Sequence, residues 1–87
     1  MKKRKKIKRY SLQERISYHH SCDVAPNRHG IKYGSPRHMY SFGFSDEVAG
    51  IDNYERAKFE FGKKAGASYR AGHRQARKLL IQQAKKK

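Results

Sequence analysis

YERAKFEFGKKAGASYRAGHRQARKL, residues 54–79, is the stretch with the clearest helical pattern in this 87-residue chain. At 100° per residue, its small and apolar side chains fall within a sector of about 60°. Basic side chains fall on the opposite side. The pattern predicts one long helix that buries one face and presents the other to phosphate. The buried face comprises Tyr54, Phe61, Ala65, Gly72, Ala76 and Leu79, and the basic face comprises Arg56, Lys63, Arg70, Arg74 and Arg77.

Three glycines weaken this predicted helix, namely Gly62, Gly66 and Gly72. Each costs about 1 kcal/mol relative to alanine in a helix interior. We therefore expect any break in the helix near residues 66–72. We favour a structural interpretation of the glycines, in which small residues let another helix pack closely.

Capping signals place two further helices before this stretch. Ser35 and a following proline, with Gly50 as a stop signal, predict a helix over residues 36–49. The capping-box spacing of Ser11 and Glu14 predicts a short helix over residues 12–20. Residues 21–35 contain the turn-forming residues Pro26, Asn27, Gly30, Gly34 and Ser35 and are predicted as a long loop, with room for a short strand over 31–33.

The fold class that follows is mainly α, a small helical domain of about three helices with one long loop. Aliphatic side chains are few, and the chain has six Tyr and four Phe, so we expect an aromatic core. The predicted core residues are Tyr40, Phe42, Phe44, Tyr54, Phe59 and Phe61.

Charge divides the chain into a near-neutral body and two basic ends. The chain has 22 Lys and Arg against 7 Asp and Glu, a formal net charge of +15. Like-charge runs fold poorly, so residues 1–9 and 85–87 are predicted as flexible basic tails around a single helical domain over residues 10–84. A lone Cys22, no secretory signal and no long apolar run predict a cytoplasmic protein without a membrane span.

The basic ends predict a nucleic-acid partner, because each Lys or Arg that neutralises a phosphate releases condensed counterions. The predicted phosphate contacts are Lys3, Arg4, Lys5, Arg9, Arg56, Lys63, Arg70, Arg74, Arg77 and Lys78. Tyrosines interleave with these cations, as in proteins that stack unpaired bases on aromatic rings. The candidates for stacking are Tyr10, Tyr33 and Tyr69, although some of these rings are needed for the core.

Metal, cofactor and catalytic chemistry find little support in the sequence. One cysteine and four scattered histidines lack the paired spacing of a zinc site. They are His19, His20, Cys22, His29 and His38. No nucleophile has a neighbouring base and oxyanion loop, and no Walker-type phosphate loop is present. We therefore expect a non-enzymatic protein with no metal and no cofactor.

Glycines and aromatic residues between positions 43 and 62 have a recognisable spacing: Gly43-Phe44, Gly50, Tyr54 and Phe59-Glu60-Phe61-Gly62. This spacing resembles the ribosome modulation factor family, very small basic proteins that bind ribosomal RNA on the small subunit and silence ribosomes. The chain lacks the family's Cys-Pro before the tyrosine and has Phe where the family has Trp. The resemblance implies a ribonucleoprotein partner and favours RNA over DNA.

A protein partner is the alternative from another functional class. Lys and Arg are also attracted to acidic protein surfaces. Small size, basicity and the lack of a catalytic set are equally typical of a phage or mobile-element inhibitor of a host nucleic-acid enzyme, of the anti-restriction or anti-CRISPR type. Sequence alone does not separate this interpretation from nucleic-acid binding.

Overall fold

A computed structural model of the chain describes residues 10–85. It contains α1 (Leu12–Val24), the one-turn helix η1 (Pro26–His29), α2 (Pro36–Ala49), α3 (Tyr54–Phe61) and α4 (Lys63–Lys85). Within residues 10–85 there is no strand, so the predicted mainly α class is confirmed. The basic segments 1–9 and 86–87 lie outside the described residues, and Lys85 is the last residue of α4.

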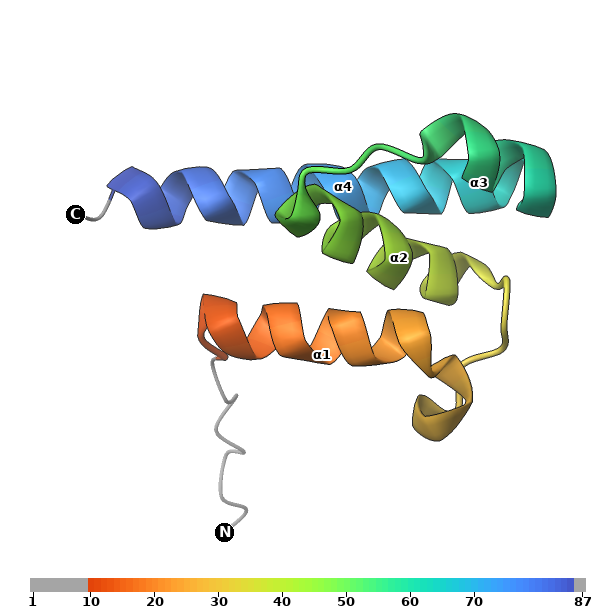
Figure 1. Ribbon diagram of the computed structural model, residues 1–87, viewed down its shortest axis with the longest axis horizontal. Coiled ribbons are helices and arrows are strands. Elements are labelled where there is room, and N and C mark those ends of the chain that lie inside the picture. The colour runs from red at the N-terminus through yellow and green to blue at the C-terminus, as the bar shows by residue number, and fades with distance from the viewer. Residues whose placement is uncertain (1–9, 86–87) are drawn as a thin grey trace, which may run out of the picture.

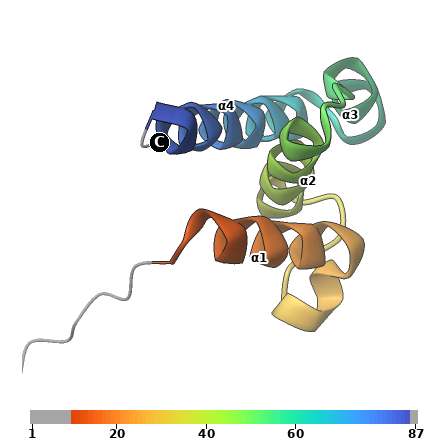
Figure 2. The ribbon, with the colours of Figure 1, turned by 60° about the vertical axis from the view of Figure 1, so that its left-hand side comes forward.

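α2 is the central element, with α1 on one side of it and α4 on the other (Figures 1 and 2). α3 folds back along the beginning of α4, whose C-terminal end projects past α2 (Figure 1). α1 packs mainly on α2 and only slightly on α4. No helix within residues 10–85 is both long enough and apolar enough to cross a bilayer.

α1 begins as predicted but is longer than predicted. The backbone N–H of Glu14 donates to Ser11 Oγ at 3.1 Å, and the N–H of Ser11 donates to Glu14 Oε1 at 2.8 Å. The helix continues to Val24, with Cys22 fully buried in its last turn, and it ends two residues before Pro26. The predicted loop over 21–35 is therefore wrong for its first four residues. Residues 31–33 form no strand, and Ile31 is a buried residue of the segment between η1 and α2.

α2 has the predicted bounds of 36–49. Ser35 Oγ accepts from the backbone N–H of His38 at 3.2 Å, and Pro36 occupies the first turn. Gly50 ends the helix in the left-handed conformation at φ +76°. Local capping chemistry is thus sufficient to set both ends of this helix.

The predicted single helix over 54–79 is two helices, and the break lies at Gly62 rather than near 66–72. Gly62 has φ +97° and ψ 174°, a conformation that favours glycine, and it turns the chain between α3 and α4. Gly66 and Gly72 remain inside α4 because they permit close packing. A Cβ on Gly66 would lie 2.9 Å from Lys58 Cβ on α3.

α2 and α4 cross at two glycines that face each other's backbone. A Cβ on Gly43 would approach the carbonyl oxygen of Tyr69 to 1.9 Å, and a Cβ on Gly72 would approach that of Tyr40 to 1.9 Å. Neither position has room for any side chain. The expectation that small residues let helices pack closely is therefore confirmed at this crossing.

The core differs from the predicted aromatic set at Phe59, which lies outside it, and at Tyr69, which belongs to it. Buried Met39, Ala57, Ala65 and Tyr69 form its centre, with Phe42, Tyr54 and Phe61 packed against them. Phe44 is buried as predicted and Tyr40 is partly buried. Phe59 is 91% exposed, because Ala57 faces α4 and a residue two positions later points about 200° away around α3. Tyr69, predicted to stack on bases, is fully buried instead.

Candidate nucleic-acid interface

α4 presents a basic face opposite its buried face. We use the term basic face for its exposed cations at helical spacing, which fall within a sector of about 100°. Ala65, Gly72 and Ala76 are buried on the other side, as the sequence pattern predicts. The basic face comprises Lys63, Arg70, Arg74, Arg77 and Lys78.

Part of the basic face forms one wall of a groove of about 700 Å³, which we call the arginine groove. The opposite wall is the segment that leads into α3. Arg56, which the break at Gly62 places on a separate helix, lies in this groove with three arginines of α4. Four of the predicted phosphate contacts are thus brought together. The lining is Asp52, Asn53, Tyr54, Glu55, Arg56, Tyr69, Arg70, His73, Arg74 and Arg77.

The arginines of the groove differ in whether they form ion pairs with carboxylates of the protein. Arg56 Nε lies 2.8 Å from Glu60 Oε1, and Arg77 Nε lies 3.3 Å from Glu47 Oε2. The Arg70 guanidinium carbon lies 4.1 Å from the centroid of the Tyr54 ring. Within residues 10–85, neither Arg70 nor Arg74 makes an ion pair. These two carry the charge that remains available to a ligand.

His73 adds a contact to the groove that the sequence interpretation missed. Its Nδ1 lies 2.7 Å from Glu47 Oε1 and its Nε2 lies 2.9 Å from the backbone oxygen of Ile51. Through these two contacts His73 joins α4 to Glu47 of α2 and to the segment that follows α2. In the sequence, the position of His73 one turn after Arg70 could have indicated that it lies in the groove. Its contact with Glu47 could not be predicted, because Glu47 is distant in the chain.

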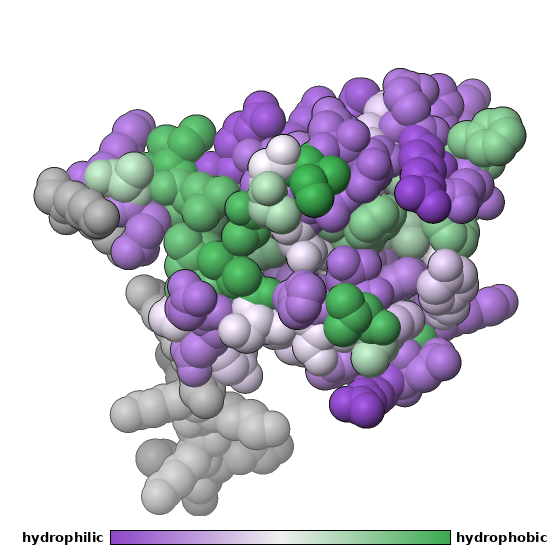
Figure 3. All heavy atoms as spheres, viewed as in Figure 1, coloured by the Kyte–Doolittle hydropathy of each residue, from purple (hydrophilic) through white to green (hydrophobic). Residues whose placement is uncertain are grey.

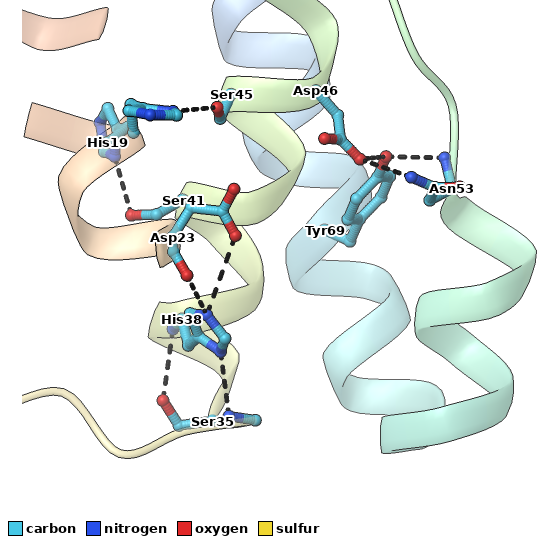
Figure 4. A network of polar contacts seen from close by, with 11 residues as sticks. His19, Asp23, Ser35, His38, Ser41, Ser45, Asp46, Asn53 and Tyr69 are labelled. Carbon is cyan, nitrogen blue, oxygen red and sulfur yellow. Dashed lines mark hydrogen bonds and ion pairs between the residues drawn. The ribbon is translucent and has the colours of Figure 1, made fainter. Parts of the chain in front are cut away.

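Tyr69 anchors the floor of the groove through a buried network (Figure 4). Its hydroxyl donates to Asp46 Oδ2 at 2.6 Å and accepts from the backbone N–H of Asn53 at 2.7 Å. The Asn53 side chain donates to the same Asp46 oxygen at 3.1 Å. Burial, and to a smaller extent the hydrogen bond to Asp46, raise the pKa of Tyr69 well above its usual range. The predicted stacking role is therefore wrong, and Tyr69 instead joins α2, α4 and the entry to α3.

The other two predicted stacking tyrosines lie away from the arginine groove. Tyr33 is 66% exposed and contacts the rings of His38 and Phe61, in a small hollow that also includes Arg56. Tyr10 is 54% exposed and lies in a second groove, between α1 and α4. The predicted cations Lys3, Arg4, Lys5 and Arg9 lie outside the described residues.

The histidines and cysteine that raised the question of metal binding are dispersed. His19 hydrogen-bonds with Ser41 at 2.9 Å, and His29 with Ser21 at 2.8 Å. His38 Nδ1 accepts from the Gly34 N–H at 3.0 Å, so its Nε2 donates to the backbone oxygen of Asp23 at 3.0 Å. Within residues 10–85, no three His, Cys, Asp or Glu side chains are grouped as a metal site requires.

Comparisons with protein-family models, with curated proteins and with solved structures find no match for this chain.

Proposed function

We propose that this chain is a non-enzymatic nucleic-acid-binding protein of the cytoplasm whose ligand is RNA, alone or in a ribonucleoprotein. The observation that carries the proposal is the arginine groove, in which four arginines from two helices gather while Arg70 and Arg74 lack acidic partners within residues 10–85. Such a surface attracts phosphate groups without a shaped pocket, because each phosphate that an arginine neutralises releases condensed counterions.

RNA is preferred to DNA as the ligand on the resemblance of residues 43–62 to the ribosome modulation factor family. In this proposal the basic face contacts phosphates. Arg56 extends the contact across the groove, and the basic segments 1–9 and 85–87 add salt-sensitive affinity. The ribosome is the ribonucleoprotein that this resemblance favours.

The test compares two double variants that remove equal charge from different places. Arg70→Gln/Arg74→Gln changes the basic face, whereas Arg28→Gln/Lys32→Gln changes exposed cations in the segment between α1 and α2. We expect the first variant to bind an RNA hairpin more weakly and to flatten the dependence of log K on log salt. The slope should fall by about 0.7–0.9 for each phosphate that the protein no longer neutralises. The second variant should retain the wild-type slope.

Equal slopes for both double variants would overturn the assignment of the basic face. A DNA duplex of the same sequence serves as the second ligand. Equal affinity for DNA and RNA would remove the preference for RNA and keep the phosphate contacts.

The alternative of a protein partner is favoured by an apolar patch beside the basic face. Figure 3 shows apolar surface over the projecting end of α4. Ile81 is 49% exposed there and shares a hollow with Arg77 and Lys78. Mixed apolar and basic surface suits an acidic protein such as a nucleic-acid enzyme. Purification with ribonuclease and high salt separates the two proposals, because only a protein partner remains bound.

A further inference from the structure

A stacked pair of side chains spans the arginine groove. Arg70 lies on α4 and Tyr54 is the first residue of α3, with 4.1 Å between the guanidinium carbon and the ring centroid. Tyr54 is partly buried against the core, and Arg70 is exposed. The Tyr54 N–H donates to Asp52 Oδ1 at 3.0 Å, which fixes the backbone that carries the ring. The pair is thus anchored on one side and open to a ligand on the other.

Guanidinium planes and aromatic rings are the protein surfaces on which unpaired bases stack. A base inside a duplex has both faces covered by its neighbours, so it cannot use such a surface. The groove of about 700 Å³ lies within the range of clefts that hold small organic ligands, roughly 300–1,000 Å³. It is therefore large enough for one nucleotide.

The two walls of the groove differ in charge, and this difference orients a nucleotide. The α4 wall carries Arg74, which makes no ion pair within residues 10–85 and lies one turn from Arg70. The opposite wall carries the carboxylates of Asp52 and Glu55 besides Arg56, whose guanidinium already pairs with Glu60 at 2.8 Å. These carboxylates accept hydrogen bonds from exocyclic amino groups of bases. A phosphate is favoured toward α4 and a base toward the beginning of α3.

We propose that the arginine groove seats one unpaired nucleotide of the RNA, with its base on the Arg70–Tyr54 pair and its phosphate against Arg74. This inference rests on the proposed function and adds to it the structural class of the RNA. The ligand is a bulge or loop rather than an uninterrupted duplex.

The test compares a stem with one bulged adenosine to the same stem without the bulge. The wild-type chain should prefer the bulged stem by about tenfold, the usual scale of stacking one base on a side chain. Arg70→Lys keeps the charge and removes the planar group, so it should abolish this preference and leave the salt slope unchanged. Arg74→Lys makes the same exchange one turn away and should keep the preference.

A spectroscopic measurement reports the stacking directly. With 2-aminopurine as the bulged base, binding of the wild type should change its fluorescence, and binding of Arg70→Lys should not. Circular dichroism of both lysine variants checks that they fold.

Three results would overturn the inference without touching RNA binding: equal affinity of the wild type for both stems, a preference that survives in Arg70→Lys, or a preference that disappears equally in Arg74→Lys. Failure of the wild type to bind either stem would instead overturn the proposed function, and the seated nucleotide with it.

Discussion

α2 contacts its two neighbours in different ways. Against α4, backbone meets backbone at Gly43 and Gly72, and the buried Tyr69 hydroxyl closes the contact on Asp46. Against α1, the contact is made by polar side chains and rings. His19 lies 4.2 Å from the Phe44 ring between centroids and hydrogen-bonds with Ser41 at 2.9 Å.

The histidines of the two interfaces also have different partners. In the α1–α2 half, the partners of His38 are backbone groups, the Gly34 N–H and the Asp23 oxygen. In the α2–α4 half, the partners of His73 are two acceptors, the Glu47 carboxylate and the Ile51 backbone oxygen. The half that carries the basic face is thus joined by close backbone packing and a carboxylate contact, whereas the other half is joined by polar side chains.

The largest expected effect comes from filling the α2–α4 crossing. Gly72→Ala places a Cβ 1.9 Å from the Tyr40 carbonyl oxygen, and only separation of the two helices relieves that contact. We expect a loss of about 3 kcal/mol or more in the free energy of unfolding, at or beyond the upper end for overpacked cores. Urea denaturation measures it. Ala71→Ser on the exposed side of the same turn is the control and should stay within about 0.5 kcal/mol of wild type.

A smaller loss is expected from the hydroxyl that closes the same interface. Tyr69→Phe leaves Asp46 and the Asn53 N–H each short of one buried hydrogen bond. The cost should be about 1–3 kcal/mol in the free energy of unfolding. Tyr40→Phe is the matched control, since the Tyr40 hydroxyl makes no hydrogen bond within residues 10–85. Equal losses for the two variants would refute the role assigned to Tyr69.

Two serine-to-alanine variants test the α1–α2 interface, because each serine hydrogen-bonds with a histidine of α1. Ser41 is buried and lies 2.9 Å from His19 Nδ1, whereas Ser45 lies 3.4 Å from His20 Nδ1 in an exposed position. We expect Ser41→Ala to cost about 1 kcal/mol and Ser45→Ala to cost less than about 0.5 kcal/mol. Thermal denaturation ranks them, and a larger effect from Ser45→Ala would reverse this assignment.

The smallest expected effect is a pH dependence carried by His19. Burial, and then the charge of Arg15, lower the pKa of His19 below its ordinary value of about 6.5. Below that value the unfolded chain binds the proton and the folded chain does not, so stability falls as the pH falls toward the folded pKa. We expect a smaller loss between pH 7.5 and 5.5 in His19→Asn than in wild type, measured by urea denaturation. Equal losses would assign the pH dependence elsewhere.

Asp23 contributes to the pH dependence with the opposite sign. Burial, and then the charge of Asp46, raise the pKa of its carboxyl above the ordinary value. The folded chain therefore takes up this proton before the unfolded chain does, and lowering the pH through that window favours folding.

Features that depend on a few neighbouring residues could be read directly from the amino-acid sequence. The capping residues Ser11, Ser35 and Gly50 fixed the beginning of α1 and both ends of α2, because a cap satisfies backbone groups within one turn. Helical periodicity alone separated the buried face of α4 from its basic face. The mainly α class follows from these local signals.

Which partner each side chain contacts depends on how the helices pack. The fold buried Tyr69, exposed Phe59 and placed Arg56 across a groove from Arg70, after Gly62 had turned the chain. Gly62, Gly66 and Gly72 look equivalent in the sequence, but their roles differ in the fold. Gly62 ends α3, whereas Gly66 and Gly72 lie where another helix packs closely on α4. The burial and the partners of a side chain depend on residues distant along the chain. A local sequence pattern therefore identifies candidate core and binding residues, and tertiary packing determines which of them are buried or exposed.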